Sequence, residues 1–252
     1  MKPRNKTVAF LIILAQTVVG LGVVLLAKII PTPFWLSPSV LVLLLFMALN
    51  VALAYLLNIK NELKNYWSLR KSYFLLLGLV GGLVIAVFPS LAALIFGEIS
   101  FEEIGIRQAI SFRLIALTLV IVAWEELWFR GVLLNFCQRK MSATTISIFV
   151  GLLFMLVHLL NPNFNLFNSG LTLFFAGTFL TVSYFYYKSI WLPLGLHFGN
   201  NVFSNLCEVE FKNELFYGSD GYFSALLLAI LTLIFWEKLN KNQPQLSTNS
   251  NG

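Results

Sequence analysis

The sequence predicts an all-α polytopic membrane protein, a bundle of about eight transmembrane helices. Two observations lead to this fold class. Hydrophobic residues make up 58% of the 252 residues, charged residues only 11%, and the mean hydropathy is +0.82, a composition outside the range of soluble domains. The apolar residues also form continuous runs rather than alternating patterns. In lipid such runs indicate helices, because a helix satisfies its own backbone hydrogen bonds.

Each predicted span is an apolar run close to the ~20 residues that one crossing needs. We expect one membrane domain, residues 1–239, followed by a disordered cytoplasmic tail, residues 240–252, which is rich in Asn, Gln and Ser. In chain order the spans are Val8–Ile30, Ser39–Ile59, Tyr73–Phe96, Ile115–Phe136, Thr144–Leu160, Leu171–Tyr187, Ile190–Cys207 and Tyr222–Trp236.

Local features distinguish several of these elements. The basic start before the first span resembles a signal peptide, but the run 7–27 exceeds an h-region and has no convincing cleavage site, so we expect an uncleaved first helix. In the third span, Gly78 and Gly82 form a small-xxx-small pair, which predicts close helix packing. The segment 101–108 mixes apolar and charged residues and fits either a short interfacial helix or a solvated loop.

Basic residues in the loops predict the orientation. With the N-terminus inside, 13 of the 17 lysines and arginines fall on the cytoplasmic side or in the adjoining half of a helix. Both termini are then cytoplasmic, and we expect the protein in the membrane of a prokaryotic cell. The formal charge of +6 is thus a topology signal, and the basic residues form no single surface for nucleic acid.

Ionisable side chains interrupt three of the predicted spans. The fourth contains Glu125, Glu126 and Arg130, in the pattern E-E-x-x-x-R. A carboxylate near the middle of a membrane costs at least ~2.5 kcal/mol, so it marks a functional site by default. The fifth span holds Phe154 and His158 as F-x-x-x-H, and the seventh holds His197 and Asn201 as H-x-x-x-N.

The order and spacing of these motifs resemble the CPBP family (CAAX protease and bacteriocin-processing, also called Abi). The likeness covers a core of about residues 115–207, and Phe129, Arg130 and Gly131 complete the F-R-G usual in the first motif. The resemblance implies an intramembrane endopeptidase related to the prenyl-protein protease of eukaryotes. It also implies that the first glutamate, Glu125, is catalytic.

Helical spacing allows these residues to meet. Glu126 and His158 lie 15 and 17 residues from the turn near Met141, or roughly 20–25 Å along their helices, so the hairpin brings them level. Glu126 and Arg130 are i, i+4 neighbours that can form a structural ion pair. Glu125 points about 100° away and is left to face a cavity as a base.

Peptide hydrolysis by water needs a base, donors for the developing oxyanion, and exclusion of bulk solvent. We predict that Glu125 and His158 activate the water and that His197 and Asn201 hold the scissile carbonyl, while Glu126, Arg130 and Phe154 give structural support. No cofactor is favoured. The alternative is zinc bound by Glu125, His158 and His197, each from a different helix.

Two other classes remain as alternatives. A non-catalytic scaffold or bacteriocin-immunity protein would keep the fold but lose motif residues, and none is missing. A proton-coupled transporter would show an inverted repeat with broken helices, and the sequence shows no such symmetry. The predicted partners are the lipid bilayer and a peptide or lipidated-protein substrate, such as a prenylated CAAX-type protein, with no nucleic acid; the sequence identifies no partner protein.

Overall fold

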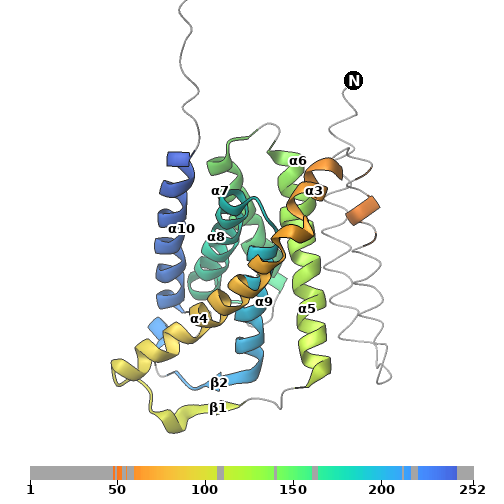
Figure 1. Ribbon diagram of the computed structural model, residues 1–252. Helices are drawn as coiled ribbons and strands as arrows, with labels where there is room; N and C mark the ends of the chain where they lie inside the picture. The colour runs from red at the N-terminus through yellow and green to blue at the C-terminus, as the bar shows by residue number, and fades with distance from the viewer. Residues whose placement is uncertain are drawn as a thin grey trace, which may run out of the picture.

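The computed structural model describes residues 60–106, 111–138, 141–160, 164–211, 213–216 and 221–242, together with residues 48, 50–52 and 55. The predicted first span, 8–30, lies outside the described residues. Within the predicted second span, 39–59, residues 48, 50–52 and 55 are described, and all of them are helical. Figure 1 shows the described helices gathered into one bundle.

The other six predicted spans each coincide with a helical stretch. In chain order the elements are α3 (Lys60–Tyr66), the 3-10 helix η1 (Leu69–Lys71), α4 (Tyr73–Ile95), η2 (Phe101–Glu103), β1 (Ile104–Ile106), α5 (Phe112–Glu126), the π-helix η3 (Leu127–Leu133), α6 (Leu134–Cys137), α7 (Ala143–Val157), η4 (His158–Leu160), the π-helix η5 (Leu166–Gly170), α8 (Leu171–Tyr187), α9 (Trp191–Leu206), β2 (Cys207–Val209), η6 (Glu214–Phe216) and α10 (Tyr222–Asn242). The bounds of α8 are those predicted. Helix α10 continues into the first three residues of the predicted tail, and residues 243–252 lie outside the described part.

Fewer helices than predicted qualify as membrane spans by length and composition. Among the described residues these are Tyr73–Ile95, Leu166–Tyr187 and Tyr222–Lys241, and Ala143–Val157 is a shorter apolar helix. Helices α5 and α9 have only 15 and 16 residues, because a π segment follows α5 and a strand follows α9. The protein is a helical membrane protein, but eight crossings are not established.

A small two-stranded sheet closes one end of the bundle (Figure 1). Strand β1 pairs antiparallel with β2, with Ile104 opposite Val209 and Ile106 opposite Cys207. Of the predicted segment 101–108, residues 101–103 form the short 3-10 helix η2 and residues 104–106 form a strand, which neither predicted alternative included. Its partner strand lies about a hundred residues further along the chain, a pairing that local sequence does not reveal. The sheet ties the connection between α4 and α5 to the end of α9.

Glycines bring α4 and α9 into backbone contact. A Cβ atom at Gly78 would lie 2.9 Å from the Gly195 Cα, and one at Gly199 would lie 3.0 Å from the Leu83 backbone nitrogen. The Gly78–Gly82 pair of α4 therefore faces a second small-xxx-small pair, Gly195 and Gly199, on α9. The close packing predicted for the third span is confirmed, and it fixes which face of α9 turns away from α4.

The short turn between α8 and α9 is held by the chain segment before α4. Lys71 donates from Nζ to the carbonyl of Lys188 at 2.7 Å, where the backbone has the left-handed φ of 48°. The ring centroids of Tyr66 and Tyr184 are stacked 4.3 Å apart, and the backbone carbonyl of Tyr66 accepts a hydrogen bond from the Ile190 backbone. These contacts hold α9 at the height at which it enters the bundle.

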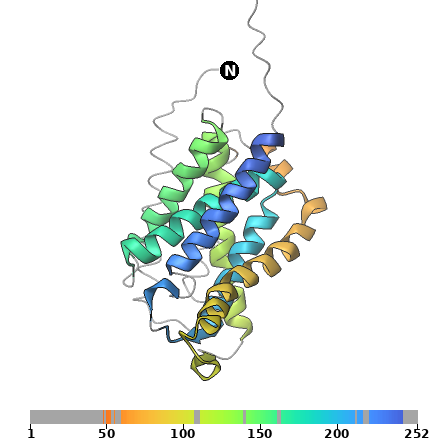
Figure 2. The ribbon, with the colours of Figure 1, turned by 90° about the vertical axis from the view of Figure 1, so that its left-hand side faces the viewer.

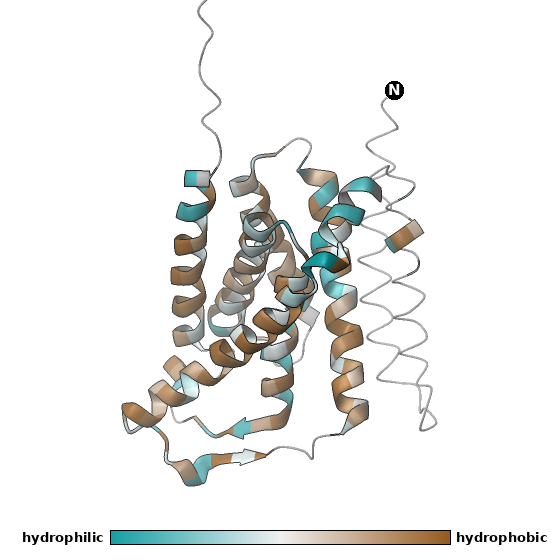
Figure 3. Cartoon of the chain, in the orientation of Figure 1, coloured by the Kyte–Doolittle hydropathy of each residue, from teal (hydrophilic) through white to brown (hydrophobic). Residues whose placement is uncertain are grey.

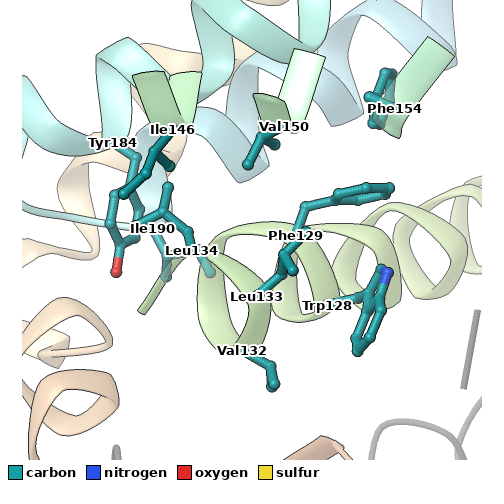
Figure 4. Close-up of a cluster of buried hydrophobic side chains, with 10 residues drawn as sticks. All are labelled: Trp128, Phe129, Val132, Leu133, Leu134, Ile146, Val150, Phe154, Tyr184 and Ile190. Atoms are coloured by element: carbon teal, nitrogen blue, oxygen red, sulfur yellow. The ribbon is translucent and has the colours of Figure 1, made fainter. Parts of the chain in front are cut away.

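Apolar side chains cover the outside of the bundle as well as its core. Leu226, Ile230 and Leu233 recur on one face of α10 and are exposed, as expected of a face toward lipid (Figure 3). Figure 2 shows α10 beside α8 on one side of the bundle. Inside, the η3 and α6 segment packs against α7, with Phe129 pointing toward Phe154 (Figure 4).

Candidate active site

The first motif lies where α5 gives way to the π-helical segment η3. Helix α5 ends at Glu126, and all seven residues of η3 are buried before α6 resumes α-helical geometry. Short π segments inside α-helices are rare and frequently occur at functional sites. Here the segment carries Arg130 and begins directly after the glutamate pair.

A buried asparagine supports this irregular backbone. Asn135 is fully buried, and its amide nitrogen lies 2.9 Å from the Arg130 carbonyl and 2.7 Å from the Gly131 carbonyl, donating to both. The same nitrogen lies 2.8 Å from the Tyr184 hydroxyl oxygen, so its two hydrogens are shared among three acceptors, and the Asn135 amide oxygen accepts from Gln138 at 2.7 Å. The three motifs did not identify Asn135. The feature of the sequence that could have indicated it is a single amide side chain within an apolar run.

Arg130 is the centre of the buried charge cluster. Its Nη1 donates to Glu126 Oε1 at 2.9 Å, and its Nη2 donates to the Gly177 carbonyl of α8 at 2.9 Å, with both charged side chains fully buried. A Cβ at Gly177 would lie only 2.7 Å from the Phe154 Cβ, so this helix crossing needs a glycine. A buried charge pair is stabilised by hydrogen bonds to its members; here Arg130 Nη1 and Nη2 and Glu126 Oε1 have them, whereas Arg130 Nε and Glu126 Oε2 make none with the described residues.

His197 joins this cluster from α9. Its Nδ1 lies 2.9 Å from the same Glu126 oxygen, and because a carboxylate oxygen accepts, Nδ1 carries a hydrogen and donates. The other ring nitrogen, Nε2, is then turned toward Glu125, whose Oε2 is 3.6 Å away. Glu126 therefore links the first motif to the third as well as pairing with Arg130, a link that the sequence did not predict.

Glu125 stands apart from the ion pair. Its Oε2 is buried and makes no hydrogen bond with any described residue, although the side chain as a whole is 15% exposed. A buried carboxylate oxygen without a donor is uncommon and asks for an explanation such as water or a ligand. Glu125 lines a cavity that has room for water or a ligand.

The second motif, Phe154 and His158, places its rings between the residues of the first and third motifs. The Phe154 ring centroid lies 4.9 Å from the His158 ring, 5.7 Å from the His197 ring and 5.4 Å from the Arg130 Cζ. His158 Nδ1 donates to the Phe154 carbonyl at 2.7 Å, which leaves Nε2 as the acceptor in the neutral ring. Within the described chain, no hydrogen bond or ion pair joins His158 to Glu125 or His197.

One cavity connects the predicted site residues. It has a volume of about 290 Å³, and its lining includes Glu125, His158, His197 and Asn201. Asn201 accepts a hydrogen bond of 3.5 Å from the neighbouring Asn200 amide. The three motifs therefore meet at one place inside the bundle, where a base, two imidazoles and an amide face the same volume.

The zinc alternative stays a prediction. Among the described residues, no group of three His, Cys, Asp or Glu side chains is placed to hold a metal ion. Glu125 and His197 are close to each other, and the hydrogen bond from His158 Nδ1 to a backbone carbonyl leaves Nε2 as the acceptor atom of that ring. The reaction proposed below is the metal-free one that the sequence favours.

Part of the chain matches a known protein family. Residues 107–203 match the model of the Rce1-like family, described as type II CAAX prenyl endopeptidases. Neither the curated proteins nor the solved structures contain a match to this chain. The matched region contains every predicted site residue from Glu125 to Asn201. Residues 107–203 are thus similar to the Rce1-like family of CAAX prenyl endopeptidases, in agreement with the resemblance of the three motifs to the CPBP family.

Proposed function

We propose that this protein is an intramembrane endopeptidase that hydrolyses a peptide bond in a membrane-embedded or lipid-anchored substrate, with prenylated CAAX-type peptides as the first candidates. The observation that carries the proposal is the facing pair of Glu125 and His197, 3.6 Å apart at a cavity inside the bundle. The family match over this region supports the same class of reaction.

Glu125 acts as the general base. A water molecule in the cavity gives a proton to Glu125 while its oxygen attacks the scissile carbonyl, and the Nε2 acceptor of His158 orients that water. The carbonyl oxygen becomes an oxyanion. Protonated Glu125 then gives its proton to the leaving amine, the C–N bond breaks, and the products are a carboxylic acid and an amine.

His197 and Asn201 stabilise the oxyanion. With Nδ1 donating to Glu126, His197 in its imidazolium form presents an Nε2 hydrogen to the cavity, and Asn201 adds a neutral amide donor one helical turn away. Removing one such donor from a hydrolase typically lowers kcat by roughly 10²–10³-fold. In this scheme Glu126 holds His197 in place, and His197 and Asn201 are the two hydrogen-bond donors to the oxyanion.

The charges of the cluster balance throughout this scheme. Glu125 and Glu126 carry two negative charges, and Arg130 and imidazolium His197 carry two positive charges. When Glu125 takes the proton of water, the cluster gains one positive charge as the substrate gains one negative charge. The net charge inside the membrane never changes, which avoids the large cost of an isolated charge in lipid.

We also propose that both termini are cytoplasmic, in a prokaryotic cell membrane. Lys64, Arg70 and Lys71 lie in α3 and η1, at the same end of the bundle as the last turn of α10 (Figure 1). At the opposite end, acidic Glu102 lies in η2, directly before the sheet, and Glu208 lies in strand β2. The positive-inside rule then favours a cytoplasmic α3 end.

The test is cleavage of a quenched fluorescent prenylated peptide by purified protein in lipid nanodiscs. Wild type is compared with Glu125→Ala, with Glu102→Ala as an exposed carboxylate control, and with wild type plus a strong zinc chelator. We expect cleavage by wild type and Glu102→Ala, none by Glu125→Ala, and no effect of the chelator. Loss of activity on chelation, restored by zinc, would overturn the metal-free scheme; full activity of Glu125→Ala would overturn the role of the base.

A further inference from the structure

A row of neutral polar side chains continues along α9 from His197. Asn200, Asn201, Ser204 and Asn205 follow at helical spacing, and all four line the same cavity. Residues on an α-helix advance by about 100°, so this row lies roughly opposite the glycines that pack on α4. The close α4 contact therefore turns the amide and hydroxyl groups inward.

The row has the length of a short peptide segment. From His197 to Asn205 the helix rises by roughly 12 Å, which equals roughly three to four residues of an extended chain. An extended peptide in lipid has main-chain N–H and C=O groups that need hydrogen-bond partners, because water is absent there. Side-chain amides supply both donors and acceptors, and therefore match a peptide main chain on both counts.

The side chains of this row make few hydrogen bonds with the described residues. The Asn200 amide makes one hydrogen bond among the described residues, to Asn201 at 3.5 Å, the outer limit of such a bond. Asn205 donates to the Thr118 hydroxyl of α5 at 3.2 Å, which joins α5 and α9 at the far end of the row. Asn200 thus stands between the reacting groups and this closed end.

Much of the remaining lining of the cavity is apolar. Leu173, Ala176 and Leu180 of α8 and Leu228 of α10 contribute to it, together with the polar side chains of Thr172 and Ser224. The side chains of an extended strand stand perpendicular to its main-chain hydrogen bonds, so a strand hydrogen-bonded along α9 would direct its side chains toward the lining on either side of this row. The cavity therefore has a polar face for a main chain and a mostly apolar lining for side chains.

We propose that Asn200 and the row from His197 to Asn205 bind the main chain of an extended, apolar peptide segment of three to four residues on one side of the scissile bond. This proposal rests on the proposed endopeptidase function and names the part of its site that fixes substrate register. Asn200 is a substrate-binding residue in this account and takes no part in proton transfer.

Binding of defined peptides by the full-length protein tests the proposal. The probe is a dansyl-labelled S-farnesyl peptide, together with analogues in which one main-chain amide, up to four residues on either side of the cleaved bond, is replaced by an ester. Dissociation constants are measured in nanodiscs for the Glu125→Gln variant, which should not cleave the peptide, and for the double variant that also carries Asn200→Leu. Asn200→Gln, which keeps the amide, and thermal melting of each variant control for folding.

One neutral hydrogen bond is worth about 1 kcal/mol, so we expect Asn200→Leu to weaken binding of the amide peptide roughly fivefold to tenfold. One ester analogue should bind the Glu125→Gln variant more weakly than the amide peptide by the same factor. Adding Asn200→Leu should not weaken the binding of that analogue further. Three results would overturn the subsite: Asn200→Leu leaves binding unchanged, the losses caused by Asn200→Leu and by every ester add in full, or no probe binds. Binding as expected but no cleavage by wild type would overturn the endopeptidase function and leave the subsite standing.

Discussion

Replacing Asn135 with leucine should destabilise the whole protein, although residue 135 lies outside all three motifs. The two side chains have the same branching and leucine is the larger, so the change removes hydrogen bonds without leaving a cavity. It takes the amide donor from the carbonyls of Arg130 and Gly131 and from the Tyr184 hydroxyl, and it removes the acceptor used by Gln138.

The expected loss follows from those four contacts. The contact to Tyr184 joins two helices, and interhelical hydrogen bonds in membranes are worth about 0.6 kcal/mol on average; a buried group left without a partner costs about 1–3 kcal/mol. We therefore expect Asn135→Leu to lower the free energy of unfolding by about 2–4 kcal/mol. Thr181→Val is the matched control, because it removes one buried hydrogen bond, to the Gly177 carbonyl, and should cost less than about 1 kcal/mol.

The assay is reversible unfolding in mixed micelles of a mild detergent and sodium dodecyl sulfate. The π segment should also lose its geometry, so residual folded Asn135→Leu should show a lower kcat with little change in KM. An unfolding free energy within about 0.5 kcal/mol of wild type would refute the reasoning, since four buried polar contacts would then contribute nothing measurable.

Three further predictions follow. Glu126→Gln, which weakens the contacts to Arg130 and His197, should lower kcat/KM for the prenylated peptide roughly tenfold to hundredfold, and an unchanged rate would contradict its positioning role. Gly195→Leu should prevent the α4–α9 contact, because even a Cβ atom would lie 2.7 Å from the Leu79 backbone nitrogen; a folded yield equal to wild type after detergent extraction would argue against this packing. In right-side-out vesicles, with Cys137 and Cys207 replaced by alanine, an impermeant maleimide should label Glu102→Cys and spare Lys238→Cys. The reverse labelling would invert the topology.

Apolar run length predicted the described helices well. The bounds of α8 match, and α4 begins where predicted, because each helix is a single run ended by polar or charged residues. The π segments and the β1–β2 pair were not predictable. A π turn leaves the apolar run unbroken, and the strand partners are far apart in sequence.

The motifs brought the right helices together but described the site incompletely. Helical spacing correctly paired Glu126 with Arg130 and separated Glu125 from them. It gave no sign that Glu126 also holds His197, because that contact crosses 71 residues. The Asn135 amide and the polar row of α9 were missed because isolated amides in an apolar run have no fixed spacing relative to the motifs.

The most direct test of water activation by Glu125 is cleavage of the prenylated peptide in water enriched in oxygen-18, with the products weighed by mass spectrometry. Wild type should yield two fragments, with one heavy oxygen in the new carboxylate of the first, and Glu125→Gln should yield neither fragment. Cleavage by Glu125→Gln at the wild-type rate, or a single turnover by wild type without label in the new carboxylate, would contradict this account of the site.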